Sequence, residues 1–352
     1  MTEQGLSVMP RWPLAACYVG DRTVTLLEAE QRRPGAGEVE LDVAYTGICG
    51  TDLHIVHGAM DARVSLPTVL GHEMSGSIAA VGDGVTGWSV GDHVTVMPLD
   101  WCGSCPACRA GHTHVCHNLN FLGIDSPGSM QGSWVVPARA LVALPPDLPS
   151  EVGALVEPTA VAVHDVRRAA LRQGEKAVVV GGGPIGLLVA CVARAAGADV
   201  LVLELSEQRR VLAESLGLKA VDPAGCDIDA LVADWTDGAG VTVGFEVSGA
   251  VAGLDQAINL LAVRGRLVVV AIHATPPPVN LFRVFWRELT LIGARVYDRS
   301  DFEEAIRLLH ECAVPAARLI TRIEPLSRVA AAFDALESGE AMKILIACGE
   351  ES

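Results

Sequence analysis

The sequence has no apolar run approaching the ~20 residues of a membrane-spanning helix, and its opening lacks the basic start and apolar stretch of a secretory signal. We therefore expect no membrane partner. Basic residues are also scarce, since 26 lysines and arginines stand against 42 aspartates and glutamates, for a formal net charge of -16. This balance argues against binding to nucleic acid or to anionic membrane surfaces.

The length of 352 residues is long for one hydrophobic core, so two domains are expected. The first third is rich in glycine and proline and contains short β-like runs at 39–49, 76–82, 92–98 and 132–145. A helical pattern covers 151–171, and from there apolar strand runs alternate with amphipathic helices. This alternation predicts an α/β fold with a parallel sheet covered on both faces. Its strands are expected at 177–181, 199–206, 241–249, 265–273 and 289–296.

Four cysteines lie close together with the spacing C-x2-C-x2-C-x7-C, at Cys102, Cys105, Cys108 and Cys116. Four thiolates suit one tetrahedral zinc ion with no open position, which would hold a loop in shape rather than perform chemistry. A disulfide pair and an iron–sulfur cluster are the alternatives. Zinc is favoured because the remaining cysteines are scattered and the chain is typical of a cytoplasmic protein.

Gly181, Gly183 and Gly186 form G-x-G-x-x-G between a predicted strand and a predicted helix, the arrangement of a dinucleotide-binding turn. Glu204 ends the next strand, where a carboxylate binds ribose hydroxyls and repels a 2′-phosphate, so NAD is favoured over NADP. Arg209 and Arg210 follow and offer a possible site for a 2′-phosphate, so NADP remains the alternative coenzyme. Further candidates for this coenzyme site are Pro184, Ile185, Val247, Ile272 and Gly293.

A second metal site is indicated by Cys49 and His72, with Glu73 and Glu157 competing for a third position. A thiolate, an imidazole and one carboxylate would leave the fourth zinc position open for chemistry. Zinc lowers the pKa of a hydroxyl group that it binds, which favours hydride loss to a nicotinamide. Thr51 could accept the released proton and His54 could pass it on.

Together these motifs resemble the zinc-dependent medium-chain dehydrogenase/reductase family. The resemblance spans nearly the whole chain, through GICGTDLHI, LGHEMSG, the four-cysteine segment, LVEPTAVAVH and GGGPIG. It implies a GroES-like β-rich catalytic domain, a Rossmann coenzyme domain and a cleft between them. We accordingly expect the catalytic domain in 1–165 and 297–352, with its zinc lobe at about 100–118, and the coenzyme domain in 166–296.

Within the family, the Glu-Pro at 157–158 is similar to polyol (sorbitol) and butanediol dehydrogenases, and 288–309 resembles the butanediol type. GHTHVC at 111–116 is similar to threonine dehydrogenases, but Trp101 replaces the histidine that those enzymes carry before the first lobe cysteine. The resemblance also suggests a substrate pocket bordered by Ile55, Phe121, Leu122, Arg295 and Tyr297.

The predicted protein is thus a cytoplasmic, zinc- and NAD-dependent oxidoreductase. It would transfer hydride between NAD and a secondary alcohol of a polyol, sugar or diol, using two zinc ions per chain. A threonine-type amino-alcohol dehydrogenase and a non-catalytic, zinc-stabilised nucleotide-binding protein are the alternatives. The apolar strand at 289–296 would leave an uncovered sheet edge, so we expect a homotetramer, with a dimer as the fallback.

Overall fold

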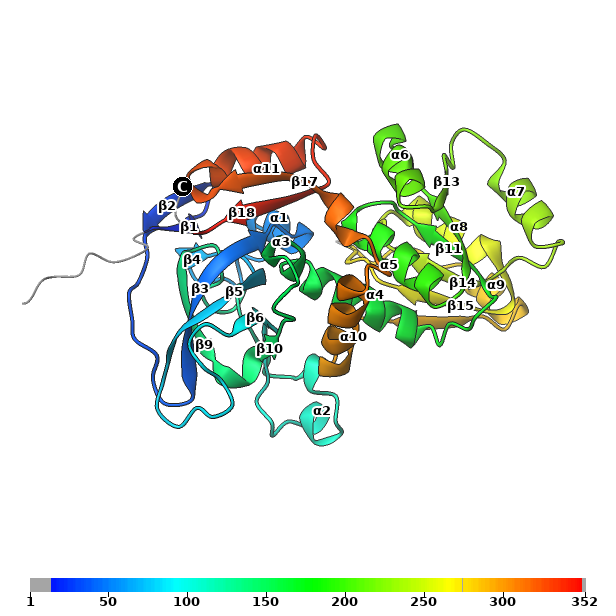
Figure 1. Ribbon diagram of the computed structural model, residues 1–352. Coiled ribbons are helices and arrows are strands. Elements are labelled where there is room, and N and C mark those ends of the chain that lie inside the picture. Colours follow the sequence, from blue (N-terminus) through cyan, green and yellow to red (C-terminus); the bar gives the residue numbers. More distant parts are fainter. Residues whose placement is uncertain (1–13, 274, 350–352) are drawn as a thin grey trace, which may run out of the picture. The chain divides into compact units, whose positions relative to one another are not determined.

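The chain folds into two compact units, shown in the computed structural model of Figure 1. The structure describes residues 14–273 and 275–349. Unit 1 contains the described residues up to Glu157 and from Ile320 onward, and unit 2 contains Pro158–Leu319. Compared with the boundaries expected above, unit 2 gains 158–165 and 297–319. Residues 1–13 and 350–352, at the ends of the expected catalytic domain, lie outside the described part.

Unit 1 is built mainly of β-strands. Its largest sheet has seven strands in the order β10-β6-β5-β3-β18-β17, and β9 also pairs with β3. The expected strand at 132–145 is two strands, because a short 3-10 turn at Ala138–Ala140 separates them. The strands of unit 1 are β1 (Leu14–Tyr18), β2 (Val24–Glu28), β3 (Glu38–Gly47), β4 (Thr68–Val69), β5 (Glu73–Val81), β6 (His93–Val96), β7 (Leu99–Asp100), β8 (Asn120–Phe121), β9 (Ser133–Pro137), β10 (Leu141–Ala143), β17 (Ile320–Pro325) and β18 (Lys343–Ala347).

Strand β3 organises unit 1, since it pairs antiparallel with β5, β9 and β18. Its sequence alternates, so Val39, Leu41 and Val43 are buried while the residues between them are partly exposed. The helices of this unit are short. They are α1 (Gly50–Val56), α2 (Pro106–Arg109), α3 (Ser150–Gly153) and α11 (Val329–Glu337), with 3-10 turns at Thr113–Val115 and Leu326–Arg328.

Unit 2 contains a six-stranded sheet whose neighbouring strands are all parallel. The order β13-β12-β11-β14-β15-β16 is that of a Rossmann dinucleotide-binding fold. Its strands are β11 (Lys176–Val180), β12 (Asp199–Leu203), β13 (Lys219–Val221), β14 (Val241–Glu246), β15 (Leu261–Val269) and β16 (Thr290–Gly293). Its helices are α5 (Pro184–Ala195), α6 (Glu207–Ser215), α7 (Ile228–Trp235), α8 (Val251–Leu260), α9 (Leu281–Trp286) and α10 (Arg299–His310).

The expected helix at 151–171 is two helices, because α3 ends at Gly153 and α4 (Val156–Arg168) begins anew. The boundary between the two units falls in the first turn of α4. The central strands of unit 2 are mainly apolar and mostly buried, as expected of a sheet that is covered on both faces. In the described part of the chain, no helix is long and apolar enough to cross a membrane.

Candidate functional site

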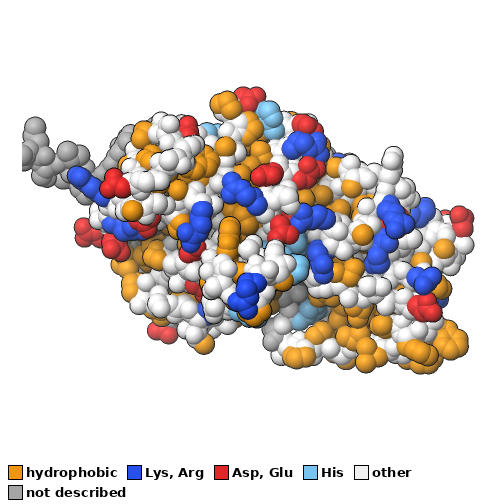
Figure 2. All heavy atoms as spheres, turned by 90° about the horizontal axis from the view of Figure 1, so that it is seen from below, with side chains coloured by type: hydrophobic (Ala, Val, Ile, Leu, Met, Phe, Trp, Pro, Cys, Tyr) orange, Lys and Arg blue, Asp and Glu red, His pale blue; other side chains and the backbone are white. Residues whose placement is uncertain are grey.

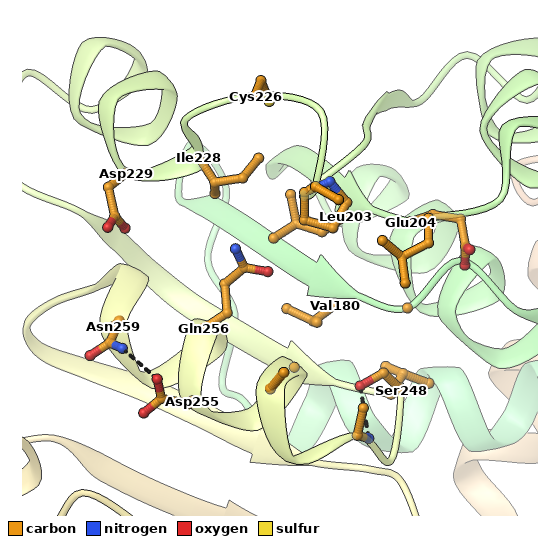
Figure 3. A pocket seen from close by; sticks show the side chains of 18 of the residues that line it. Val180, Leu203, Glu204, Cys226, Ile228, Asp229, Ser248, Asp255, Gln256 and Asn259 are labelled. Atoms are coloured by element: carbon orange, nitrogen blue, oxygen red, sulfur yellow. Dashed lines mark hydrogen bonds between the residues drawn. The ribbon is translucent and has the colours of Figure 1, made fainter.

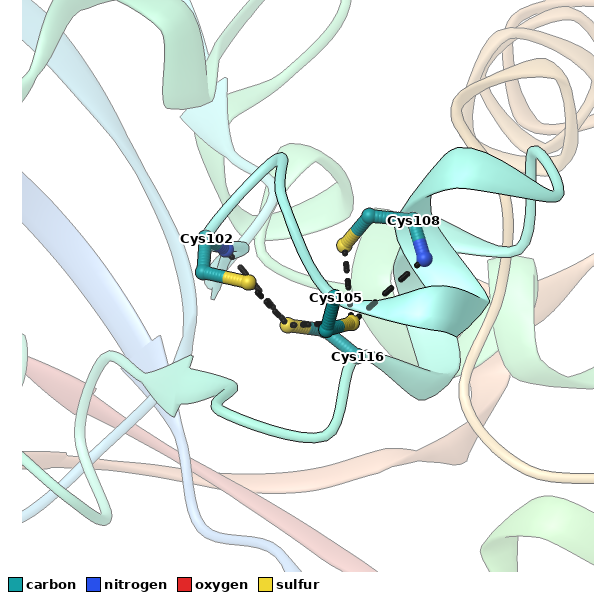
Figure 4. Close-up of side chains that lie close together, drawn as sticks. All are labelled: Cys102, Cys105, Cys108 and Cys116. Carbon is teal, nitrogen blue, oxygen red and sulfur yellow. Dashed lines mark hydrogen bonds between the residues drawn. The ribbon is translucent and has the colours of Figure 1, made fainter.

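The four-cysteine segment forms a compact sulfur cluster around α2 (Figure 4). The Sγ atoms of Cys105 and Cys108 are 3.5 Å apart, and Cys116 Sγ lies 3.8 Å from Cys105 and 3.5 Å from Cys102. Sulfurs about 2.3 Å from a tetrahedral centre are about 3.8 Å apart, so this cluster has the size of a zinc site. All four cysteines are free thiols, and their spacing is far longer than a disulfide bond, which rules out the disulfide alternative.

Backbone amides stabilise thiolates in this cluster. Cys105 Sγ accepts hydrogen bonds from the N–H groups of Cys108 and His117, at 3.5 and 3.4 Å. These bonds lower the pKa of Cys105, and hydrogen bonds from Ser104 lower the pKa of Cys102 to about 5. A low thiol pKa favours the deprotonated form that binds zinc.

A second group of donors lies in unit 1, where Cys49, His72 and Glu73 offer ligand atoms that are all within 4.8 Å of one another. Cys49 caps the N-terminus of α1, His72 precedes β5, and Glu73 begins that strand. His72 and Glu73 are only 2% and 1% exposed. A mixed sulfur, nitrogen and oxygen set of this kind fits zinc with an open coordination position.

The charges around His72 favour a cation in this group. Burial alone would lower the pKa of His72, but Asp52, Cys49 and Glu157 together raise it to about 10. The pKa of Cys49 is raised by its burial and by the charge of Glu73. A bound divalent cation would instead lower the pKa of Cys49, because it would stabilise the thiolate directly. The donors present therefore fit a zinc ion.

Two charged residues that the sequence analysis did not single out support this group. Lys343, at the start of β18, pairs with the carboxylate of Glu73 and donates a 2.9 Å hydrogen bond to the carbonyl of Ile48. Asp52 accepts a 2.8 Å hydrogen bond from the backbone N–H of Cys49, and its other oxygen lies 3.7 Å from His72 Nδ1. The three-residue spacing from Cys49 to Asp52 is that of a capping box, which is a signal in the sequence.

The other predicted members of this site lie nearby in unit 1 but outside the group of three. Glu157 is 4% exposed, and its charge raises the pKa of both His72 and Lys343. Thr51 and His54 both belong to α1, where Thr51 is partly buried and His54 is exposed. Among the predicted pocket residues, Phe121 packs edge-on against the ring of His72, with 5.4 Å between ring centroids.

The remaining predicted pocket residues differ in exposure. Ile55 and Leu122 are buried in unit 1. In unit 2, Tyr297 is 0% exposed and packs against Phe302, with ring centroids 4.7 Å apart, whereas Arg295 is exposed.

The glycine turn of unit 2 follows β11 and leads into α5. Gly181 has a φ of +104°, which favours glycine. A Cβ on Gly186 would lie 1.9 Å from the carbonyl oxygen of Gly181, so only glycine allows this close packing. A Cβ on Gly183 would meet only Arg209 Nη1, at 4.0 Å, which leaves room for a pyrophosphate at the start of α5. The three glycines thus have the separate roles that a dinucleotide turn requires.

Glu204 lies at the end of β12 beside this turn. Its two carboxylate oxygens accept hydrogen bonds from the backbone N–H groups of Gly182 and Ser206, each at 2.7 Å. Arg209 Nη1 lies 3.8 Å from Glu204 Oε2. Arg210 donates instead to the backbone carbonyls of Glu204 and Leu205, at 2.9 and 2.6 Å. Arg209 is therefore the better placed of the two arginines for a ligand.

A cavity of about 820 Å³ lies against these residues in unit 2 (Figure 3). Of the predicted coenzyme residues, those that line it are Gly181, Gly183, Glu204, Arg209 and Val247. Pro184, Ile185 and Gly186 build the start of α5 beneath the turn. Ile272 and Gly293 are exposed and do not line this cavity.

The sequence matches the models of two domain families. Residues 35–146 match the alcohol dehydrogenase GroES-like domain, and residues 184–311 match the zinc-binding dehydrogenases. With the fold and both donor groups described above, the chain belongs to the zinc-dependent medium-chain dehydrogenase/reductase family, whose members are oxidoreductases.

Individual relatives are similar over nearly their whole length. A 2-dehydro-3-deoxy-L-galactonate 5-dehydrogenase from Pseudoalteromonas atlantica is 50% identical, over 96% of this chain and 99% of the relative. The crystal structure of 2R,3R-butanediol dehydrogenase from Bacillus subtilis has a TM-score of 0.87 and 34% identity, covering 95% and 99% of the two chains. A zinc-binding dehydrogenase structure from Sinorhizobium meliloti 1021, bound to NADP, has a TM-score of 0.90 and 28% identity, covering 96% and 99%. An L-threonine 3-dehydrogenase from Pyrococcus horikoshii shares less, at 34% identity over 91% of this chain and 94% of the relative.

Proposed function

We propose that this protein is a zinc-dependent dehydrogenase that oxidises a secondary hydroxyl group of a sugar acid or related polyol with NAD. The close approach of Cys49 and His72 carries this proposal, because a thiolate and an imidazole, completed by the carboxylate of Glu73 or Glu157, suit a catalytic zinc ion. The 50% identity to an enzyme named for a deoxy sugar acid favours that substrate class over a simple diol or threonine.

Cys49 and His72 would hold the catalytic zinc ion, together with Glu73 or Glu157. When bound there, zinc supplies Lewis acidity that lowers the pKa of a substrate hydroxyl. The ammonium of Lys343 already pairs with Glu73, which weakens that carboxylate as a metal ligand. We therefore favour Glu157 for the third position.

The residues of α1 would remove the proton that alcohol oxidation releases. The Thr51 hydroxyl can accept one proton and donate another, so it can pass a proton on without becoming charged. His54 is exposed and can release that proton to solvent. Cys49 caps the N-terminus of α1, so Thr51 lies in the first turn of this helix, two residues from a proposed metal ligand.

In unit 2, the pyrophosphate of the coenzyme would bind at the glycine turn and the adenosine ribose at Glu204. Each Glu204 oxygen already accepts one backbone hydrogen bond, and a carboxylate oxygen retains a further lone pair for a ribose hydroxyl. A 2′-phosphate would meet the negative charge of Glu204, which favours NAD. Arg209 is the group that would bind a 2′-phosphate if the coenzyme were NADP.

We also propose two zinc ions per chain, a cytoplasmic location and a homotetramer, with a dimer as the fallback.

Support for assembly comes from α9, where Phe282, Phe285 and Trp286 are 71%, 74% and 70% exposed. Large aromatic side chains grouped at a surface favour a protein partner. Strand β16, at the edge of the parallel sheet, could pair with its copy about a two-fold axis.

The test is reduction of NAD and NADP, followed by nicotinamide absorbance, with zinc-loaded protein and a substrate panel. The panel contains 2-dehydro-3-deoxy-L-galactonate, which carries a secondary hydroxyl group at C5, together with L-galactonate, sorbitol, 2,3-butanediol and L-threonine. We expect the highest kcat/KM with a sugar acid and NAD. A preference for threonine would support the amino-alcohol alternative, and zinc-loaded protein that binds NADH but oxidises none of these compounds would support the non-catalytic alternative.

A further inference from the structure

The cavity of unit 2 continues beyond the glycine turn and Glu204 into a region walled mainly by apolar groups. Leu203 ends β12, Ile228 begins α7, and Val180 ends β11, and all three line this part of the cavity (Figure 3). An apolar slot next to a ribose site suits a planar base.

Charge also separates the two parts of the cavity. Arg209 is the one basic residue among those that line it, and it lies near Glu204. Asp229 and Asp255 line the cavity on the side away from Glu204 (Figure 3). A phosphate is disfavoured in that acidic part, whereas a neutral heterocycle is not.

One face of α8 forms the wall opposite Ile228. Ala252, Gln256 and Asn259 have the spacing i, i+4, i+7, and all three line the cavity. Asn259 Nδ2 donates a 3.0 Å hydrogen bond to Asp255 Oδ2, so this amide is already engaged. The Gln256 side chain points from α8 into the cavity, toward Leu203 and Ile228, as Figure 3 shows. Its amide has no hydrogen-bond partner in the part of the chain that the structure describes.

We propose that Gln256 is a specificity-determining residue that recognises the edge of the coenzyme's purine base. A primary amide presents one acceptor and one donor side by side. Adenine presents the complementary pair, an amino donor next to a ring-nitrogen acceptor, and bidentate pairing of glutamine with adenine is a well-characterised contact. This inference rests on the proposed use of a nicotinamide dinucleotide, and it assigns a polar contact within an otherwise apolar base slot.

The test compares Gln256→Leu with Asn259→Leu in the full-length, zinc-loaded protein. Both changes remove a side-chain amide from the same helix face, but the Asn259 amide is already bonded to Asp255. We measure the dissociation constant of NADH, the inhibition constant of AMP against NAD, and kcat and KM for NAD. AMP shares only the adenosine phosphate half with the coenzyme, so it locates the contact.

Loss of one or two hydrogen bonds predicts that Gln256→Leu weakens NADH and AMP by a similar factor, about 5- to 30-fold. KM for NAD should rise by the same factor, and kcat at saturating NAD should remain within about two-fold, because the base lies far along the coenzyme from the reacting ring. Asn259→Leu should change each constant by less than about three-fold. Gln256→Glu provides a second variant of similar size, which keeps an acceptor but loses the donor, and it should give an intermediate loss.

Equal effects of the two leucine variants, unchanged AMP inhibition, or a fall in kcat without a change in KM would each overturn the assignment. These outcomes are distinct from failure of the proposed function. If the unmodified protein binds no NADH or NADPH, both proposals fail; if it binds and turns over NAD normally while Gln256→Leu is without effect, only the assignment of Gln256 fails.

Discussion

Lys343 and Glu73 form a buried ion pair across 270 residues of sequence. Their side chains are only 5% and 1% exposed, and Glu73 belongs to the candidate catalytic metal group. The ammonium of Lys343 therefore compensates the negative charge of Glu73, whether or not the Glu73 carboxylate binds metal.

Replacing Lys343 by methionine should destabilise unit 1 strongly, because it leaves the Glu73 carboxylate buried without a partner. We expect a loss of about 3–5 kcal/mol in the free energy of unfolding, measured by denaturant titration of zinc-loaded protein. The matched control combines Lys343→Met with Glu73→Gln, and it should recover most of the loss. A double variant no more stable than the single one would contradict this account.

The two sulfur-containing sites should respond differently to loss of one thiol. Cys49→Ser should abolish turnover while the protein keeps its fold and about one zinc ion per chain. Cys105→Ser should instead prevent zinc binding by the four-cysteine cluster and destabilise the loop around α2, because a zinc ion bound by these four thiolates would hold that loop in shape. Metal analysis and thermal unfolding measure both effects. Unmodified native protein with fewer than two zinc ions per chain would contradict the prediction.

Glu204 should determine the choice of coenzyme. In Glu204→Ala, binding of NAD should weaken and the gap in kcat/KM between NAD and NADP should narrow, because both the ribose contact and the repulsion of a 2′-phosphate are lost. The companion variant Arg209→Ala tests whether Arg209 binds a 2′-phosphate. This variant should lower kcat/KM for NADP and leave kcat/KM for NAD unchanged. Higher kcat/KM with NADP in the unmodified enzyme would show that Arg209 dominates.

If Thr51 begins the proposed proton path, the effect of replacing it should depend on whether the new side chain carries a hydroxyl group. Thr51→Ser keeps the hydroxyl and should retain much of the activity, whereas Thr51→Val should lower kcat by about 10²-fold or more. His54→Gln should cost less, and small exogenous bases should partly restore its rate. Steady-state kinetics with a solvent isotope effect would check that proton transfer limits the rate. Nearly full kcat in Thr51→Val under those conditions would place the start of the path elsewhere, with Glu157 the next candidate.

The aromatic surface of α9 should mediate assembly. Figure 2 shows hydrophobic side chains gathered along one margin of the face in view, and Phe285 of α9 is 74% exposed. Phe285→Asp should shift the protein to a smaller assembly in light scattering at micromolar concentration, because a charge cannot be buried in an apolar interface without cost. Val90→Asp is the matched control, since Val90 is 67% exposed and belongs to unit 1. A monomeric unmodified protein would exclude both the tetramer and the dimer.

Local motifs in the sequence predicted much of the fold. The glycine turn, the parallel sheet and the donor pair of Cys49 and His72 all follow from residues whose spacing has a direct physical meaning. Strand limits were less accurate: the single expected strand at 132–145 did not take account of Pro137, which ends β9 and caps the 3-10 turn before β10.

Long-range partners could not be predicted in the same way. Lys343 opens an apolar strand, and nothing near it in sequence indicates that its partner is Glu73. Gln256 is one of several polar residues on α8, and it differs from Asn259, which lines the same cavity, because the Asn259 amide is already bonded to Asp255.

The pairing of β18 with β3 has a consequence for synthesis of the chain on the ribosome. Unit 2 is continuous in sequence, so all of its strands have been translated before Ile320 is added. Unit 1 cannot close its seven-stranded sheet until Leu345 reaches Gly47, and Glu73 has no Lys343 until that same moment. During translation, unit 2 would therefore be complete while the sheet of unit 1 still had an open edge at β3. We expect chaperones to bind unit 1 rather than unit 2 at this stage.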